Sequence, residues 1–403
     1  MINNYIKMLN NDSFQNIRSK LVCTFFGVYT FLMFSTLLYA YWLPQYGIFF
    51  GVIQKVASLV LILGCIESLV LRKPNSSYLI YVLLIILGVI VKHSSTIAFP
   101  LWFFVVLFMI SGIDFRKIVK IFFYITGILT FITVFLGFLG LIPTFSAPRG
   151  TSPDGSVLLR QALGFNWVTL SSQLFFYLVL CYIFLKKGKI TLKPLIIIFI
   201  ISVFLYEETN TRNAFILEIL LVLIFGLMNT NLKEVVLRIV ESKFIGALSI
   251  IIFPVATFIS MLSAFLGNNS SFMTKLDVLM SGRINLSHIG LERYGLSMFG
   301  TKITYNTFNT RYGLKGIYFY LDNSYIQYWL NFGTIFILVL ITLITITLIW
   351  EYKQKRWYIS LIFIFIALHS LGDPQLIYLQ YSPFVLIVDQ MIDKFRINKL
   401  FLK

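Results

Sequence analysis

The sequence predicts an all-α membrane protein that crosses a lipid bilayer about a dozen times. Hydrophobic residues make up 58% of the 403-residue chain, charged residues only 12%, and the mean hydropathy is +0.87. A soluble domain contains about 25% charged residues, so this chain lacks the polar surface that a soluble core of its size would need. Long apolar runs recur along the chain. Lipid is therefore the expected solvent for most of it.

A helix needs roughly 20 apolar residues to cross a bilayer, and twelve runs approach this length. They lie at 21–42, 47–71, 76–91, 96–113, 118–142, 162–185, 190–206, 213–229, 244–266, 324–350, 357–371 and 374–391. The first run lacks a small-residue cleavage site, so we interpret it as a retained helix. Twelve crossings place both termini on one side. We treat 1–403 as a single integral membrane domain.

The distribution of basic residues predicts the orientation. With a cytoplasmic N-terminus, 22 of the 33 lysines and arginines fall in cytoplasmic segments and 10 fall outside. Every short cytoplasmic loop is basic, and the short outside loops carry few positive charges. This asymmetry is typical of membrane proteins. We therefore expect a multi-pass protein of the bacterial plasma membrane, with cytoplasmic termini and an active face on the periplasmic or extracellular side.

Composition and motifs also argue against several functions. The net charge of +17 is divided among short clusters between apolar runs, a pattern that sets membrane topology and does not indicate nucleic-acid binding. The three cysteines lie inside apolar runs, and no His/Cys/Asp/Glu cluster has metal-ligand spacing. No phosphate-binding glycine loop occurs. We expect neither a metal nor another cofactor.

Two loops are longer than the rest, and both are predicted to lie outside. They cover about 143–161 and 267–323, and only the second is long enough to form an extracytoplasmic cap. Apolar residues recur at helical spacing over 276–299, which predicts a short amphipathic helix lying on the membrane. Aromatic residues crowd the end of this loop and either pack on sugars or anchor the chain at the membrane interface. They are Tyr305, Tyr312, Tyr318, Phe319, Tyr320 and Tyr325.

Arginine is enriched on the predicted outer face. It accounts for 6 of the 10 outside cations but only 6 of the 22 inside cations. The outside arginines are Arg149, Arg160, Arg212, Arg283, Arg293 and Arg311. The guanidinium fork matches phosphate or carboxylate bidentately, which points to a phosphorylated ligand. The alternative is pairing with local acids, such as Glu207 or Glu208 beside Arg212, or contact of Arg283 and Arg293 with lipid headgroups.

Polar residues at two other outside positions complete the candidate site. His369 precedes Asp373 by four residues in a predicted turn, and a histidine oriented by a carboxylate suits general-base chemistry. Asp322, Asn323 and Tyr325 lie at the mouth of the tenth run. Asn323 is equally well explained as a helix cap.

Several short stretches resemble the Wzy-type polymerases of bacterial O-antigen and capsular polysaccharide, within the O-antigen ligase/polymerase superfamily. The layout is similar over most of the chain, with one dominant outside loop before the last three spans. The matching stretches are Arg160–Phe165, Thr211-Arg212, Ser281-Gly282-Arg283 with Gly295 to Gly300, Asp322–Tyr325 with Asn331–Gly333, and His369-Ser370 with Asp373. Asn166-Trp167-Val168 departs from the family's usual "hPN", and Asp373 stands where the family carries a glutamate.

The resemblance implies a GT-C-like, metal-independent glycosyltransferase that polymerises oligosaccharide repeat units carried on undecaprenyl pyrophosphate. It implies catalytic roles for His369, Arg212 and Arg283. Its substrate-binding residues would be Arg160, Arg293, Asp322, Asn323, Tyr325 and Asp373. It also makes a chain-length regulator and a flippase candidate partners.

Three other functions remain open on the sequence. An O-antigen ligase, which transfers finished polymer to an acceptor, shares the layout. A flippase or transporter of lipid-linked oligosaccharides would be expected to carry ionisable groups at mid-membrane. A structural or accessory protein would leave the outside arginines individually replaceable.

Overall fold

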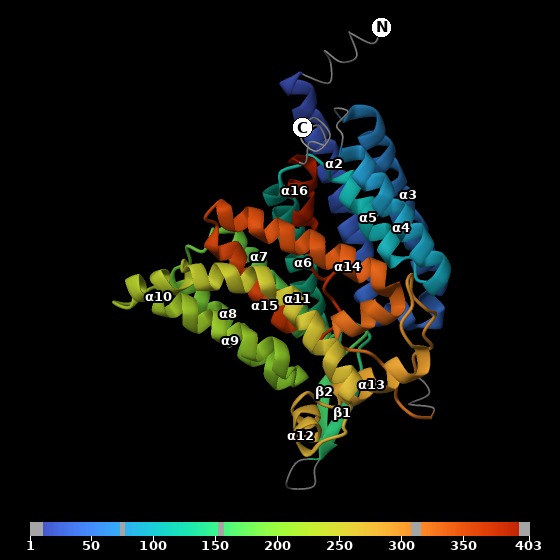
Figure 1. Ribbon diagram of the computed structural model, residues 1–403, viewed down its shortest axis with the longest axis vertical. Coiled ribbons are helices and arrows are strands. Elements are labelled where there is room, and N and C mark those ends of the chain that lie inside the picture. Colours follow the sequence, from blue (N-terminus) through green and yellow to red (C-terminus); the bar gives the residue numbers. More distant parts are fainter. Residues whose placement is uncertain (1–10, 73–76, 152–156, 308–315, 395–403) are drawn as a thin grey trace. The chain divides into compact units, whose positions relative to one another are not determined.

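The computed structural model describes residues 11–72, 77–151, 157–307 and 316–394. These residues form fifteen α-helices and one short β-hairpin (Figure 1). The predicted all-α architecture is thus confirmed, whereas the hairpin was not predicted. The chain divides into two compact units, which are described separately below.

Unit 1 comprises Met1–Asn75, Val106–Leu237 and Leu379–Asp393. Its helices are α2 (Asp12–Phe34), α3 (Gly47–Leu71), α6 (Phe115–Phe138), α7 (Leu170–Leu185), α8 (Leu192–Thr209) and α9 (Arg212–Leu227). Short helices η1 (Ser35–Leu37), η2 (Tyr39–Trp42) and η3 (Pro44–Tyr46) connect α2 to α3. The antiparallel hairpin of β1 (Ser146–Thr151) and β2 (Val157–Gln161) lies between α6 and α7 in the sequence. Near the C-terminus, η4 (Phe384–Ile387) leads into α16 (Val388–Lys394).

Unit 2 comprises Ser76–Val105, Arg238–Tyr378 and Lys394–Lys403. Its helices are α4 (Ser77–Ser95), α11 (Lys243–Leu266), α12 (Ser271–Leu279), α13 (Arg283–Tyr294), α14 (Ser324–Lys353) and α15 (Trp357–His369). Helices α5 (Phe99–Met109) and α10 (Lys233–Val240) cross the boundaries between the units along the chain. The predicted cap 267–323 contains two helices, because the chain turns at Ser281 and Gly282, where φ is 57° and 80°.

The helices are those of a multi-pass membrane protein. Six are long and apolar enough to span a membrane: Ser13–Leu37, Pro44–Leu71, Ser77–Ser95, Phe115–Phe138, Lys243–Leu266 and Ser324–Lys353. Helices occupy eleven of the twelve predicted runs. Over 374–391 the predicted spanning helix does not form, and only η4 and the start of α16 are helical there. Pro383 explains this difference, because it lies inside the run and lacks the N–H that a continuous helix requires.

Helix α3 shows why lipid is the solvent. Its apolar side chains project on several sides, and Ile48, Leu59 and Leu69 are 88%, 54% and 61% exposed. A soluble monomer rarely leaves so much contiguous apolar surface in water. In hydrocarbon the same surface carries no such penalty, and the helix satisfies its own backbone hydrogen bonds.

A buried ion pair joins the first two long helices at one end of unit 1. Arg18 Nε of α2 lies 3.2 Å from Glu67 Oε1 of α3, and both side chains are almost fully buried. Arg18 Nη2 also donates to the carbonyl oxygen of Ser111 at 3.1 Å. The three segments meet where the charge distribution predicts the cytoplasmic side.

The C-terminal helix α16 reaches the same end of unit 1. Asp393 forms an ion pair with Arg72, which directly follows α3. Asp389 accepts a hydrogen bond from the Gly112 backbone N–H at 3.3 Å. Within unit 1, α16 therefore joins helix ends that are predicted to be cytoplasmic, although 374–391 is not a continuous helix.

The opposite helix ends of unit 1 are joined by the loops that are predicted to lie outside. Asn166 N donates to Leu37 O at 2.8 Å, and Tyr39 N donates to Gly164 O at 2.9 Å. The Ser172 and Thr209 hydroxyls are 2.8 Å apart. These contacts link the α2–α3 connection, the segment before α7 and the end of α8, as alternating crossings require.

Helix α14 is interrupted by a loop from the cap. Gly333 has φ 91° and ψ 169°, so the helix changes direction there. The N–H groups of Thr334 and Ile335 are satisfied by Ser297 O and Met298 O at 2.9 and 3.1 Å. The part after the kink, 334–353, is about 30 Å long at 1.5 Å per residue, which suffices to cross the hydrocarbon core. The shorter part before the kink, 324–332, begins next to the candidate site.

We expect Gly333→Ala to destabilise the protein by about 2–5 kcal/mol, from backbone strain plus overpacking. An added Cβ would lie 2.3 Å from Gly300 N and 2.5 Å from Met298 O, and both neighbours are backbone atoms. Thermal unfolding of the detergent-solubilised protein measures the effect. Gly226→Ala is the matched control, because nothing lies within 4 Å of a Cβ at that helical position. Equal melting temperatures for the two variants would contradict the interpretation of the kink.

Candidate active site

Three segments of unit 2 bring most of the predicted site residues together. They are the start of α13, the residues that precede α14, and the turn after α15. Asn323 caps α14, because its Oδ1 accepts hydrogen bonds from Tyr325 N at 2.9 Å and Ile326 N at 3.2 Å. Ser324 ties this helix start to the turn, since its Oγ donates to Asp373 O at 2.6 Å and its N donates to Ser370 O at 2.9 Å. We refer to Arg283, Asp322, His369 and Asp373 as the cap cluster.

Arg283 is held from two sides while part of its guanidinium stays accessible. Its Nε donates to Gly372 O at 2.9 Å and its Nη1 donates to Met280 O at 3.0 Å. Nε is also 3.7 Å from Asp322 Oδ2, and about a quarter of each side chain is exposed. Among the described residues Nη2 has no protein acceptor, so its two N–H groups can bind an incoming oxygen. Arg283 thus has a local acid partner in Asp322, as one of the alternatives drawn from the sequence predicted, and its Nη2 donors stay free among the described residues.

His369 and Asp373 form the buried part of the cap cluster. His369 Nε2 lies 3.5 Å from Asp373 Oδ2, and the His369 side chain has no exposed surface. The Arg283 guanidinium is within electrostatic range of the imidazole. The structure therefore joins His369 to Asp373 and Arg283, but buries the ring that the sequence suggested as a base.

Asn323 and Tyr325, which were predicted to bind substrate, are used within the protein. Asn323 Nδ2 donates to Ser260 Oγ at 2.9 Å, in addition to its capping bonds. Tyr325 is fully buried, and its hydroxyl donates to Ala367 O at 3.0 Å. Both residues hold the start of α14 against α11 and α15, so they support the cap cluster and do not line it.

Tyr320 is a site residue that the sequence reasoning placed only within a group of aromatics. Burial, and then the nearby carboxylate of Asp322, raise the pKa of Tyr320 to about 12, with a smaller contribution from Asp373. The phenol is protonated at physiological pH, as it would be at the ordinary tyrosine pKa of about 10, and it can donate a hydrogen bond near the two acids. No local motif distinguishes Tyr320 from its neighbours, and only the fold brings it to the cap cluster.

Arg293 lies away from the cap cluster, at the other end of α13. Its guanidinium carbon is 5.3 Å from the centre of the Phe319 ring, and the side chain is exposed. Ten residues of helix separate it from Arg283, or about 15 Å along the axis. Arg311 and Tyr312 lie outside the described residues, and the side chain of Arg149 is not described.

Arg212 and Arg160 belong to unit 1. Arg212 begins α9 directly after a tight turn, in which Asn210 has φ 48° and the Thr209 and Thr211 hydroxyls are 2.9 Å apart. The arginine is exposed and forms no ion pair among the described residues, so Glu207 and Glu208 do not neutralise it there. Arg160 lies on β2 opposite Ala147, and β2 contacts α8.

A buried carboxylic acid in unit 1 escaped the sequence reasoning. Glu218 on α9 is 1% exposed and lies beside Ser202 of α8. The sequence contained a signal that could have identified it, because Glu218 is an acidic residue within the apolar run 213–229. Ionisable residues within a spanning helix are costly and usually functional.

Within the described parts of the chain, no group of three or more His, Cys, Asp or Glu residues is placed to hold a metal ion. Comparison with family models, with curated proteins and with solved structures finds no match to this chain.

Proposed function

We propose that this protein is a glycosyltransferase that joins oligosaccharide repeat units carried on undecaprenyl pyrophosphate, at the outer face of the bacterial plasma membrane. The observation that carries the proposal is the cap cluster of unit 2. There, a partly exposed arginine with free donors lies next to a buried histidine–carboxylate pair. The fold class and the short matching stretches are consistent with this function.

The reaction needs a group that stabilises a pyrophosphate as it departs. The oxygen of an acceptor hydroxyl attacks the anomeric carbon of the donor sugar, and the bond from that carbon to the pyrophosphate oxygen breaks. Arg283 Nη2 is available for the charge that develops on this leaving group. The N-terminal backbone of α13 is not, because Asp277 Oδ1 already accepts from Ile284 N and Asn285 N at 2.8 and 3.1 Å.

The same step releases a proton from the acceptor hydroxyl. In the proposal this proton passes to the His369–Asp373 pair. Because the His369 ring is fully buried and Asp373 retains 8% side-chain exposure, the carboxylate is the better-placed proton acceptor of the two. His369, whose Nε2 lies 3.5 Å from Asp373 Oδ2, then positions the carboxylate.

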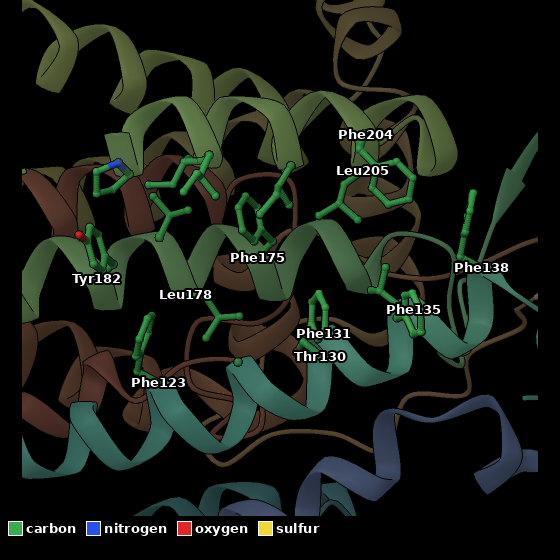
Figure 2. A pocket seen from close by; sticks show the side chains of 17 residues that line it. Phe123, Thr130, Phe131, Phe135, Phe138, Phe175, Leu178, Tyr182, Phe204 and Leu205 are labelled. Atoms are coloured by element: carbon green, nitrogen blue, oxygen red, sulfur yellow. The ribbon is translucent and has the colours of Figure 1, made fainter. Parts of the chain in front are cut away.

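An apolar pocket in unit 1 fits the lipid carrier. It has a volume of about 510 Å³ and lies between α6, α7 and α8. Figure 2 shows side chains of these helices around the pocket, with Phe123 and Tyr182 near one end and Phe138 and Phe204 near the other. Phe204, at the same end of the pocket as Phe138, lies five residues before the end of α8 at Thr209. Arg212 begins the next helix, α9, so it follows this end of the pocket closely in the sequence. In the proposal, the carrier that occupies this pocket with its phosphate at Arg212 belongs to the second of the two lipid-linked units, because the departing pyrophosphate of the first is assigned to Arg283.

Gly127→Leu is expected to weaken binding of polyprenyl phosphate about tenfold, the effect of losing about two buried methylene groups. Gly127 lines the pocket, and a Cβ there would make ordinary contact with Leu178 Cδ2 at 3.7 Å. Binding to the purified protein is measured with a fluorescent polyprenyl phosphate. Gly226→Leu, on a helix that does not line the pocket, should bind like the parent. Equal affinity for the two variants would show that the pocket does not hold the carrier.

A flippase is the second candidate, and Glu218 favours it. Buried acids within spanning helices are a recurring feature of transport pathways. Proteoliposomes loaded with lipid-linked repeat units distinguish the candidates. Transfer of units between leaflets without new glycosidic bonds would support a flippase, whereas longer lipid-linked glycans would support the polymerase. A product formed only after addition of a separate glycolipid acceptor would identify a ligase.

A further inference from the structure

Helix α12 begins immediately after a spanning helix ends. Helix α11 (Lys243–Leu266) has 24 residues and is about 36 Å long at 1.5 Å per residue, slightly more than the hydrocarbon core of about 30 Å. Its last residues, Phe265 and Leu266, are apolar and 56% and 45% exposed. Only 267–270 separate it from α12, so α12 starts within about 18 Å of the end of the spanning helix.

The side chains of α12 divide into two faces. Met273 and Asp277 are buried against the rest of unit 2. Phe272, Leu276 and Leu279 follow the i, i+4, i+7 spacing of one helical stripe. Phe272 is 71% exposed and Leu279 is 81% exposed. A stripe of this kind has no stable place in water, and none of the described residues covers its two ends.

Lys275 lies beside this stripe and is exposed. A lysine next to apolar residues at a membrane surface extends its ammonium group toward lipid phosphates while its methylenes stay in the apolar layer. Thr274 lies on the opposite side of the helix from the stripe and is also exposed. The helix thus has an apolar stripe and a basic flank, as an interfacial helix does, and its opposite side carries Thr274 together with Val278, which is 75% exposed.

We infer that α12 is seated in the headgroup region of the leaflet where α11 ends, with Phe272, Leu276 and Leu279 inserted into the acyl boundary. The ligand of this surface is the bilayer itself. Asp277 connects α12 to the cap cluster. Its Oδ1 accepts hydrogen bonds from Ile284 N and Asn285 N, and its Oδ2 accepts one from Asn268 Nδ2 at 3.1 Å. Asp277 thereby ties both the end of α11 and the start of α13 to α12. Arg283, the first residue of α13, is held at a depth that the membrane sets.

The test is the depth of individual α12 positions in the full-length protein in nanodiscs. Leu279→Cys and Thr274→Cys are labelled with the same small fluorophore, and the labelled parent measures the background from the native cysteines. Lipids that carry a nitroxide near the top of the acyl chain should quench the label at 279 several-fold more than the label at 274. Aqueous iodide should show the opposite preference.

Equal quenching by the lipid nitroxide at both positions, or stronger iodide quenching at 279, would overturn the inference. Both positions are exposed, so neither substitution disturbs the packing of α12. The measurement needs no substrate and no turnover, so its outcome does not depend on the proposed glycosyltransferase function.

Discussion

Arg283→Ala is expected to reduce polymer formation by about 10²–10³-fold, the effect of removing one preorganised donor from a developing oxyanion. Arg283 is positioned by Gly372 O and Met280 O, and its Nη2 remains free among the described residues. Alanine removes the donors as well as the positive charge. Arg283→Lys should restore little activity, because an ammonium lacks the planar fork that grips a phosphate bidentately. The measurement is the rate at which lipid-linked oligomers lengthen.

Lys302→Ala is the control for this experiment. Lys302 is an exposed cation of the same cap and has no place in the cap cluster. The control should retain parental activity and yield the same amount of membrane-inserted protein. Full activity of Arg283→Ala would remove the arginine from the reaction. Equal losses in Arg283→Ala and Lys302→Ala would reduce its role to general surface charge.

Arg18→Ala is expected to destabilise the protein by about 3–5 kcal/mol, the typical cost of leaving one member of a buried ion pair uncompensated. Arg18 and Glu67 are each almost fully buried, and Arg18 also holds the carbonyl of Ser111. Replacing both residues, with Arg18→Met and Glu67→Met, should recover most of the loss, because no buried charge is then left unpaired.

Thermal unfolding in detergent compares the single and double variants, with Lys120→Ala as the control. Lys120 is an exposed cation on α6, in the same unit. A double variant that is less stable than Arg18→Ala would contradict the view that the uncompensated charge causes the loss. An unchanged melting temperature in Arg18→Ala would show that the pair contributes nothing to the fold.

Much of the fold could be predicted from the sequence because the bilayer imposes length and composition on each helix. Eleven of the twelve apolar runs contain helices, and most of their ends were located to within four residues; both ends of α2 and the start of α7 were missed by eight or nine residues. The failure at 374–391 arises where Pro383 interrupts a run that also contains several polar residues. The kink at Gly333 was invisible, because the N–H groups that it frees are satisfied by a loop more than thirty residues earlier.

The candidate site was predictable in part for a related reason. Arg283, Asp322, His369 and Asp373 were chosen for their chemistry at helix ends on one predicted face, and the structure brings these four together. Burial was beyond the sequence. Tyr325 looked like a surface aromatic, but donates to Ala367 O inside the protein.

Arg293 and Arg283 show a second limit. The sequence placed both on one amphipathic segment, but the turn at 281–282 makes Arg283 the first residue of a new helix and leaves Arg293 ten residues along it. Composition identifies arginines on a face, whereas only three-dimensional packing shows which arginine retains free donors. Tyr320 joins the site through the same packing.

The most direct measurement is incubation of the purified protein in detergent with synthetic polyprenyl-pyrophosphate repeat units of the native sugar, followed by separation of the products by length. The proposal predicts a ladder of lipid-linked oligomers that forms without added nucleotide, and release of one polyprenyl pyrophosphate for each bond formed. Intact starting material after prolonged incubation, with the protein shown to be folded and the repeat unit confirmed, would contradict the assignment of this chain as a polymerase.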